Sequence, residues 1–463
     1  MPGKDELFYT KKSTYDIIKE DEVEGAYAYC EEYKHYLDKG KTERECVAQA
    51  IALAEKEGFK PFERGMDLPP GTKLYMDTAG KSLILAVIGK APLSKGMNIA
   101  ATHIDSPRLD LKQVPLYEDG DMAFFKTHYY GGIRKYQWVA LPLALHGTLV
   151  KKDGQSVDIV IGEDEGDPVF MVTDLLPHLS KDQDKKTLGE AFTGENLNIL
   201  IGSRPDGADK DAEKEKDRVK LTVMKILNEK YGIVEEDFLS AEVEAVPAMR
   251  ASDVGFDRSM IGAYGHDDRS CSFAALRALL DLEVPEKTAV CVLSDKEEIG
   301  SEGITGMQSA AFDYFVEELC SAGGSLLRDC YRGSFCLSMD VCNAFDPNFA
   351  DVSEKLNGAK LGYGLGVMKF SGSRGKSGSS DATAEDVAML RSLFAESGVT
   401  WQMAELGKVD QGGGGTVAKF LANRNIPTID AGVPVLSMHA PYEIVSKLDC
   451  YMAYKGIKAL FSK

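Results

Sequence analysis

Histidine and carboxylate side chains stand at the ends of five apolar segments of this chain, and side chains of these types bind divalent metal ions. The five residues are His103 (ATHIDSP), Asp267 (GHDDRSCSF), Glu298 (SDKEEIGSEG), Asp340 (SMDVCNAFDP) and His439 (SMHAPYE). Such ligands suit zinc, and also cobalt or manganese. One residue of this kind is common in proteins without metals, but two histidines and three acids at successive segment ends predict a site for two metal ions.

Two further acids lie beside these candidates. Asp105 comes two residues after His103, so in an extended chain its carboxylate lies on the same side and can accept the second N–H of the imidazole. Glu297 precedes Glu298 and can act as a general base while its neighbour binds a metal ion. A buried His–Asp pair and an exposed pair of glutamates are also ordinary structural features. The catalytic interpretation therefore depends on all the candidates together.

Asp267 and Asp268 are adjacent acids ahead of a segment with helical periodicity. An acid at this position can cap the helix by accepting backbone N–H groups, or it can bridge two cations. The spacing does not decide which of the two is the ligand. Asp340 and His439 also have simpler interpretations, since a Lys or Arg partner satisfies a buried acid and many histidines after apolar runs are core residues.

The elements that must position these residues alternate between strands and helices after residue 251. Apolar runs predict strands at 72–77, 82–89, 97–105, 288–294, 334–340 and 428–432. Apolar periodicity predicts helices at 13–58, 272–282, 383–398 and 442–461, with a capping box at Thr42 and Glu45. In α/β sheets, sites form at the carboxyl ends of strands, which is where the candidates stand.

Residues 108–250 have a different pattern, with short alternating segments separated by turn residues and no long helical period. We therefore predict one α/β domain formed by 1–107 and 251–463, interrupted by a β-rich domain at 108–250. Inside the insertion, residues 207–220 are dense in charge and are expected to form a solvated loop. Gly412–Gly415 lack the Gly-Lys-Ser/Thr of a phosphate-binding loop and predict a turn or a wall of a substrate pocket.

Composition limits the class of protein. The chain has 463 residues, of which 44% are apolar and 27% charged, as in folded globular proteins. A net charge of -19 argues against nucleic acid as a partner. The N-terminal sequence has no secretion signal and no run approaches the ~20 apolar residues of a membrane span, so we expect a cytoplasmic protein. Nine cysteines without a C-x-x-C pair predict reduced core thiols.

Five blocks, HIDSPRL, KEEIGSEG, SMD with DPNF downstream, GGGGT and SMHAPYE, resemble in sequence and order those of the aspartyl aminopeptidase family of dinuclear metallopeptidases. That family is related to the tetrahedral glutamyl-type aminopeptidases. The resemblance covers nearly the whole chain. It implies a zinc-peptidase-like α/β/α catalytic domain with a mixed sheet, interrupted by a β-rich dimerisation domain, in a homo-oligomeric dodecamer built from dimers. The implied activity is metal-dependent removal of the N-terminal residue from short peptides.

The resemblance also implies roles for the ligands. His103 and Asp340 would hold one metal ion, Glu298 and His439 the other, and Asp267 would bridge the two. Zinc is the expected metal.

For the remaining residues, the resemblance makes Glu297 the general base and Asp105 the acid that orients His103. His178, in LLPHLS, resembles a histidine of the inserted domain that binds substrate in a neighbouring subunit's active site.

Two alternative functions and the preference for the N-terminal residue of the substrate remain open. A carboxypeptidase or amide deacylase could use the same metal pair and would cleave substrates whose amino end is blocked. A catalytically silent assembly protein would bind no metal. The Asp268-Arg269 pair looks more like the glutamyl-type group than the Leu-Asp-Asn block of the aspartyl family, so the preferred N-terminal residue is not assigned.

Overall fold

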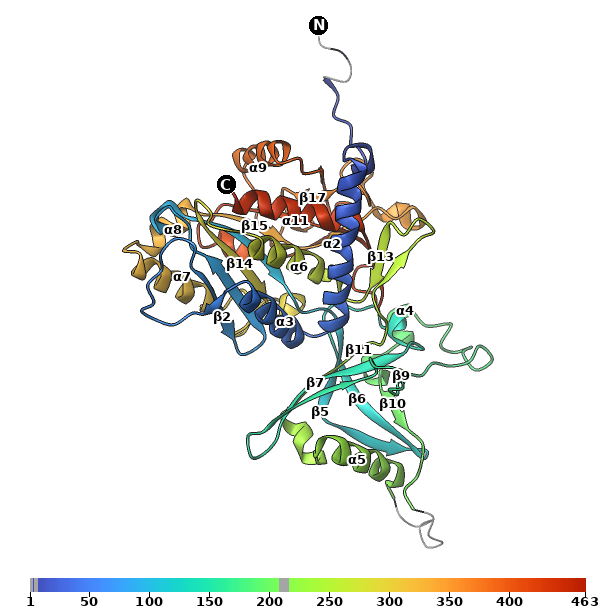
Figure 1. Ribbon diagram of the computed structural model, residues 1–463. Coiled ribbons are helices and arrows are strands. Elements are labelled where there is room, and N and C mark those ends of the chain that lie inside the picture. Colours follow the sequence, from blue (N-terminus) through green and yellow to red (C-terminus); the bar gives the residue numbers. More distant parts are fainter. Residues whose placement is uncertain (1–2, 4–6, 208–215) are drawn as a thin grey trace. The chain divides into compact units, whose positions relative to one another are not determined.

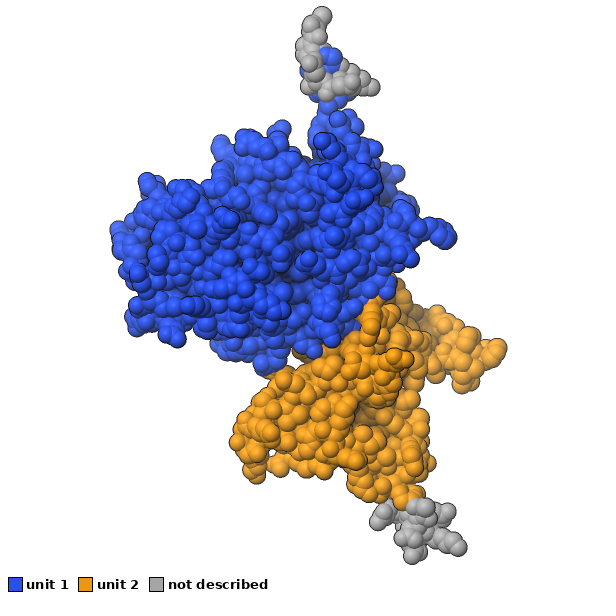
Figure 2. Space-filling model, in the orientation of Figure 1, with its two compact units in different colours: residues 1–105, 251–438, 443–463 blue, residues 106–250, 439–442 orange. Residues whose placement is uncertain are grey.

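The computed structural model describes residue 3, residues 7–207 and residues 216–463. The chain forms two compact units (Figure 2): residues 1–105, 251–438 and 443–463 make up the first, and residues 106–250 and 439–442 the second. The sequence analysis placed the divisions after residues 107 and 250, and the compact units divide after residues 105 and 250. The segment 439–442, which the sequence placed in the catalytic domain, groups with the second unit.

The first unit is built on a nine-stranded mixed sheet (Figure 1). In order across the sheet the strands are β1 (Lys60–Pro61), β2 (Lys73–Thr78), β3 (Ser82–Val87), β14 (Thr288–Ser294), β4 (Met97–His103), β15 (Phe335–Met339), β21 (Thr428–Gly432), β17 (Leu365–Met368) and β19 (Trp401–Met403). The four central strands β14, β4, β15 and β21 run parallel, and β3 and β17 flank them in antiparallel pairing. All the strands predicted from apolar runs are therefore present.

Helices cover both faces of this sheet. Along β3, Leu83, Leu85 and Val87 enter one apolar core, whereas Ile84 and Ala86 enter the other, because successive side chains of a strand point to opposite faces. The first core is completed by α2 (Glu20–Lys39), α3 (Glu43–Lys56), α6 (His266–Leu280), α9 (Ala384–Glu396) and α11 (Lys447–Phe461). The second is completed by α7 (Ala311–Ala322), α8 (Leu327–Gly333) and α10 (Ala418–Ala422). The layers are thus α/β/α.

The predicted helix 13–58 is divided into α2 and α3 by a break at Gly40. Gly40 ends α2, and its N–H is donated to the carbonyl oxygen of Tyr36. The predicted capping box is present, since Thr42 Oγ1 accepts the N–H of Glu45 at 3.2 Å and the Glu45 carboxylate accepts the N–H of Thr42 at 3.1 Å.

The first unit also contains a five-stranded sheet, and one of its strands occupies the start of a segment that was predicted as helix. Its order is β12 (Ser252–Val254), β13 (Met260–Ala263), β23 (Glu443–Ser446), β22 (Pro434–Leu436) and β16 (Cys342–Asn343). The predicted helix 442–461 is therefore the strand β23 followed by α11, because pairing with β13 and β22 outweighs local helical periodicity. The glycine-rich segment forms part of a small two-stranded antiparallel sheet, in which β18 (Gly372–Ser373) pairs with β20 (Gly413–Gly414).

The second unit is a seven-stranded antiparallel sheet, as expected of a β-rich insertion. In order its strands are β8 (Ser156–Ile161), β7 (Leu143–Val150), β11 (Ala241–Pro247), β5 (Arg108–Asp119), β6 (Met122–Tyr130), β10 (Ile199–Gly202) and β9 (Met171–Val172). It also contains α4 (Leu188–Ala191) and α5 (Arg218–Tyr231), and the latter was not predicted. Most of the charge-dense segment 207–220 lies outside the described residues.

No helix in the described part of the chain is both long and apolar enough to cross a membrane.

Candidate metal centre and active site

Three parallel strands of the central sheet end beside one another and carry most of the candidate residues. Strand β4 ends at His103, β14 is followed by the 3-10 helix η7 (Glu297–Ile299), and β15 is followed directly by Asp340. The register pairs Ser294 with His103, so the ends of β14 and β4 are level. Asp267 comes from the first turn of α6. Segments far apart in the sequence are thereby brought to one edge of the sheet.

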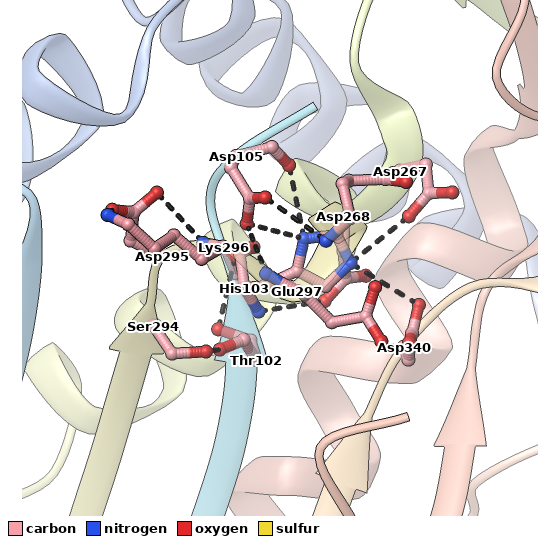
Figure 3. Close-up of polar contacts among 12 residues, drawn as sticks. Thr102, His103, Asp105, Asp267, Asp268, Ser294, Asp295, Lys296, Glu297 and Asp340 are labelled. Atoms are coloured by element: carbon pink, nitrogen blue, oxygen red, sulfur yellow. Dashed lines mark hydrogen bonds and ion pairs between the residues drawn. The ribbon is translucent and has the colours of Figure 1, made fainter. Parts of the chain in front are cut away.

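His103 lies at the centre of a buried cluster of acids (Figure 3). Its Nε2 atom is 3.2 Å from Asp267 Oδ1 and 3.6 Å from Asp340 Oδ1. Ligand atoms of His103, Asp267 and Glu298 lie within 4.8 Å of one another, and so do those of His103, Glu297 and Asp340. The structure thus brings together five of the residues singled out from the sequence.

The donor set fits divalent metal ions. Two ligand atoms bound to one tetrahedral zinc ion at about 2 Å are about 3.3 Å apart, close to the spacing from His103 to Asp267 and Asp340. Buried carboxylates this close repel one another unless a cation or a proton compensates. Burial, followed by the charge of Asp340, accordingly raises the pKa of Glu297 to about 8. A cation in the cluster would oppose that shift by favouring the charged carboxylate.

Asp105 holds two parts of the cluster at once. Its Oδ1 atom is 3.3 Å from His103 Nδ1, as the sequence predicted, and its backbone oxygen is 3.1 Å from the same nitrogen. Oxygen partners on Nδ1 retain the proton there and place the lone pair on Nε2, which faces Asp267. The Asp105 carboxylate also accepts the backbone N–H groups of Glu297 at 3.1 Å and Glu298 at 3.2 Å. Sequence reasoning missed this second role, because no local pattern connects residues 105 and 297.

The structure separates the roles of the two adjacent acids of α6. Asp267 faces His103 Nε2, whereas Asp268 Oδ2 accepts the backbone N–H of His103 at 3.4 Å. The N–H of Asp267 is itself donated to Glu443 Oε2 at 3.1 Å. Asp267 is therefore the candidate ligand, while Asp268 and Glu443 hold the backbone around the site. Neither of these supporting roles was visible in the sequence.

A buried Tyr–His pair precedes Asp267 along the chain. The hydroxyl of Tyr33, in α2, is 2.7 Å from His266 Nδ1, and His266 Nε2 is 3.1 Å from the carbonyl oxygen of Ile261. Burial lowers the pKa of His266 to about 3, so the ring is neutral. A neutral ring that donates from Nε2 and accepts at Nδ1 satisfies both contacts. The pair holds the first residue of α6 in place. In the sequence, the only sign of this role is that His266 is adjacent to Asp267.

Two predicted site residues belong to the second unit. His439 Nδ1 lies 2.9 Å from the carbonyl oxygen of Gly132, which retains the proton on Nδ1 and places the lone pair on Nε2, the form that binds metals. His178 is exposed in the segment between β9 and α4. Neither is among the residues that the first unit brings together, so their assignment as a metal ligand and a substrate-binding residue stays a prediction.

Buried acids around an imidazole, at the strand ends of an α/β/α sheet, define a class of metal-dependent hydrolases. The chain belongs to one family of that class, the aminopeptidase I zinc metalloproteases (M18), whose family model matches residues 36–461. It is 50% identical over 470 residues to a probable M18 family aminopeptidase 1 of Clostridium acetobutylicum, and the match covers 100% of both chains.

Solved structures show the same fold. The crystal structure of an M18 family aminopeptidase from Thermotoga maritima matches with a TM-score of 0.93 and 43% identity, over 98% of this chain and 100% of that one. A chain of the S. cerevisiae mApe1 dodecamer matches with a TM-score of 0.74 and 22% identity, over 93% of this chain and 95% of that one. The predicted mixed α/β fold and the aminopeptidase class are confirmed, and the chain is a zinc metalloaminopeptidase that acts on peptide bonds.

Proposed function

We propose that this enzyme removes single residues from the free amino end of short peptides, with Glu297 as the general base. The observation that carries the proposal is the arrangement of two adjacent acids in η7. The side chains of Glu297 and Glu298 belong to two different triads that share His103, while Asp105 holds both of their backbone N–H groups. One acid can therefore bind a metal ion while its neighbour faces the same centre.

In this proposal the ligands are those that the resemblance implies. His103 and Asp340 hold one ion, Glu298 and His439 the other, and Asp267 contacts both. When bound, two divalent ions supply Lewis-acid polarisation of the scissile carbonyl and make water more acidic. Zinc is the expected metal, and cobalt or manganese also suits these ligands.

Glu297 takes the proton from the attacking water and returns it to the leaving amine. Burial favours this role, because it raises the pKa of the Glu297 carboxyl and so makes proton uptake easier. Asp105 keeps His103 in one orientation and holds η7 in place through the two N–H groups. No other group of the chain is required to move a proton in this scheme.

We further propose that the chain acts as a homo-oligomer, a dodecamer built from dimers, with the second unit as its dimerisation and lid domain. The support is a group of leucines around His178 whose exposed fractions are 51% for Leu175, 50% for Leu176 and 67% for Leu179. Exposed apolar groups of this density are typical of protein interfaces. His178 would then contact substrate in a neighbouring subunit. A cytoplasmic location and peptide partners, without nucleic acid or membrane, complete the proposal.

The experiment that tests the general base is the Glu297→Gln substitution. It keeps the size of the side chain but removes the proton acceptor, so we expect kcat to fall by about 10²- to 10⁴-fold. Turnover of aminoacyl chromogenic substrates is measured together with bound zinc. The control is Glu302→Gln, an exposed glutamate a few residues along the chain, which should retain wild-type turnover.

Full activity of Glu297→Gln with zinc still bound would eliminate Glu297 as the base. Two comparisons in the same assay complete the test. Peptides acetylated at the amino end should not be cleaved. The chelated enzyme is also reloaded with zinc, cobalt or manganese and assayed on a panel of aminoacyl chromogenic substrates, so that the turnover rates identify the metal and the preferred first residue.

A further inference from the structure

The loop that carries Glu297 and Glu298, residues 295–306, closes on itself. Asp295 forms a bridge with Gly306, and its N–H is donated to the carbonyl oxygen of Thr305 at 3.2 Å. Within the loop, the N–H of Ser301 is donated to the carbonyl oxygen of Lys296 at 2.6 Å. The entry and the exit of the loop are thus held together by the backbone.

Gly306 shows how tightly the loop closes. A Cβ at Gly306 would lie 2.3 Å from the carbonyl oxygen of Ser301, closer than non-bonded atoms can approach. Only glycine fits at this position.

Three side chains form a closed ring of hydrogen bonds at the base of the loop, which we call the clasp: Asp295, Lys296 and Thr305. The Thr305 hydroxyl donates to Asp295 Oδ2 at 2.6 Å and accepts from Lys296 Nζ at 2.6 Å. Lys296 Nζ also donates to the same carboxylate oxygen at 2.5 Å. A hydroxyl has one proton to donate, and here that proton and an acceptor position are both used.

The clasp lies mostly within the protein. The Asp295 side chain is 1% exposed and that of Lys296 is 26% exposed. A buried carboxylate is stable only when opposite charge and hydrogen bonds compensate for lost hydration, and Lys296 with Thr305 supplies both. Removing Lys296 or Thr305 therefore leaves the buried Asp295 carboxylate without part of this compensation, and we expect the loop to change as a result.

The loop has a second, separate anchor. The clasp holds its ends, and the Asp105 carboxylate accepts the N–H groups of Glu297 and Glu298, which come directly after Lys296. The carboxylates of these two glutamates lie near His103, so both anchors act on the part of the loop that reaches the cluster. Fixing both ends of a short segment limits the directions that its side chains can take.

We propose that Asp295, Lys296 and Thr305 are positioning residues of the enzyme. By closing the loop before substrate or metal binds, the clasp directs Glu297 toward Asp340 and Glu298 toward Asp267. The inference rests on the proposed roles of Glu297 and Glu298 for its effect on catalysis, and on the geometry alone for its effect on the loop.

The test compares Thr305→Val, which keeps the branched shape but removes the hydroxyl, with Thr305→Ser, which restores it. In Thr305→Val we expect kcat to fall about tenfold while KM changes less than about threefold, and zinc affinity to weaken about tenfold. Hydrogen exchange of the metal-free protein should be faster across residues 295–306. Thr305→Ser should recover all three properties.

Lys296→Met gives a second route to the same contact if Thr305→Val does not fold, because its side chain reaches the surface. Glu302→Gln, which lies in the same loop with an exposed side chain, is the matched control and should behave as the wild type. Equal effects in Glu302→Gln would overturn the proposal, because they would show a general sensitivity of the loop.

The proposal is also overturned if Thr305→Val and Lys296→Met retain wild-type kcat, zinc affinity and hydrogen exchange. Failure of the proposed base gives a different result. In that case Glu297→Gln stays active, and the clasp is still judged by hydrogen exchange and zinc affinity, neither of which requires Glu297 to move a proton.

Discussion

The first unit buries carboxylates such as Asp105 and Asp267, which cost free energy to remove from water, whereas the second unit leaves leucines such as Leu176 and Leu179 in contact with water. Each unit thus has a group of side chains in an unfavourable environment: buried acids in the first unit and exposed leucines in the second. A cation would compensate the charge of the acids clustered around His103, and another protein surface would cover the group of leucines around His178. In the function that we propose, metal ions complete the first of these groups and further copies of the chain cover the second.

The largest expected effect comes from testing whether the two units serve one active site across subunits. We expect His178→Ala to lower kcat about 100-fold, because a substrate contact that positions the reacting atoms is lost. Mixed oligomers of His178→Ala and Glu297→Gln chains should recover measurable activity, since an intact His178 of one chain can complete a site with an intact Glu297 in another.

The control for this experiment is His128→Ala, an exposed histidine of the second unit, which should remain active alone. Mixtures without any recovery would show that His178 acts within its own chain or not at all. In that case the exposed segment around His178 would not complete an active site in another subunit.

A smaller effect is expected from placing charge on the exposed leucines. The double substitution Leu176→Asp and Leu179→Asp should lower the mass of the assembly measured by light scattering, because burying a charge at an interface costs free energy. The matched control is Leu326→Asp, a leucine of the first unit with a similarly exposed side chain. An unchanged mass in the double variant would contradict the proposal that these leucines lie at an interface between subunits.

The smallest effect on activity is expected at Asp449, a buried acid of α11 for which no metal ion is proposed and whose titration should change the stability of the protein. It accepts the N–H groups of Gly362 and Gly364 at 2.7 Å each, and burial raises its pKa to about 8. In the unfolded chain the pKa is about 3.9, so between these values the folded protein retains a proton that the unfolded chain releases. The stability that this group confers at low pH is therefore lost as pH rises through about 4 to 8.

The measurement is urea unfolding of the metal-free protein at about pH 5 and about pH 9. The wild type should lose stability relative to Asp449→Asn as pH rises, by up to about 1.4 kcal/mol per pH unit, because the amide cannot ionise. The control is Asp329→Asn, an exposed acid of α8. A constant difference between wild type and Asp449→Asn would mean that Asp449 does not change its charge in this range.

The sequence was most informative where strands end. Apolar runs located β4, β14 and β15, and each of them is followed closely by, or ends at, a residue of the cluster: His103 at the end of β4, Glu297 and Glu298 shortly after β14, and Asp340 directly after β15. This worked because parallel strands bring their carboxyl ends to one edge whatever their order along the chain. The β-rich character of 108–250 was visible for a similar reason, since alternation with a period of two is a local signal.

Contacts between distant segments could not be read from the same patterns. The choice of Asp267 over Asp268 depends on which carboxylate turns toward His103 Nε2, and the second role of Asp105 depends on the path of the loop after β14. Residues 443–446 were assigned to a helix because one partner strand, β13, is far away in the sequence, and the pairing with the nearby β22 leaves no sign in local periodicity. Tertiary pairing overrides local preference in such cases.

The nine cysteines predicted as reduced core residues are all buried and outside disulfides, and every one of them lies in the first unit. A thiol reagent can reach them only when that unit opens, so the rate of labelling reports its local unfolding. The inserted unit, which has no cysteine, stays silent in the same measurement. The natural cysteines therefore report local unfolding of the first unit alone. A single cysteine introduced into residues 106–250 would report local unfolding of the second unit.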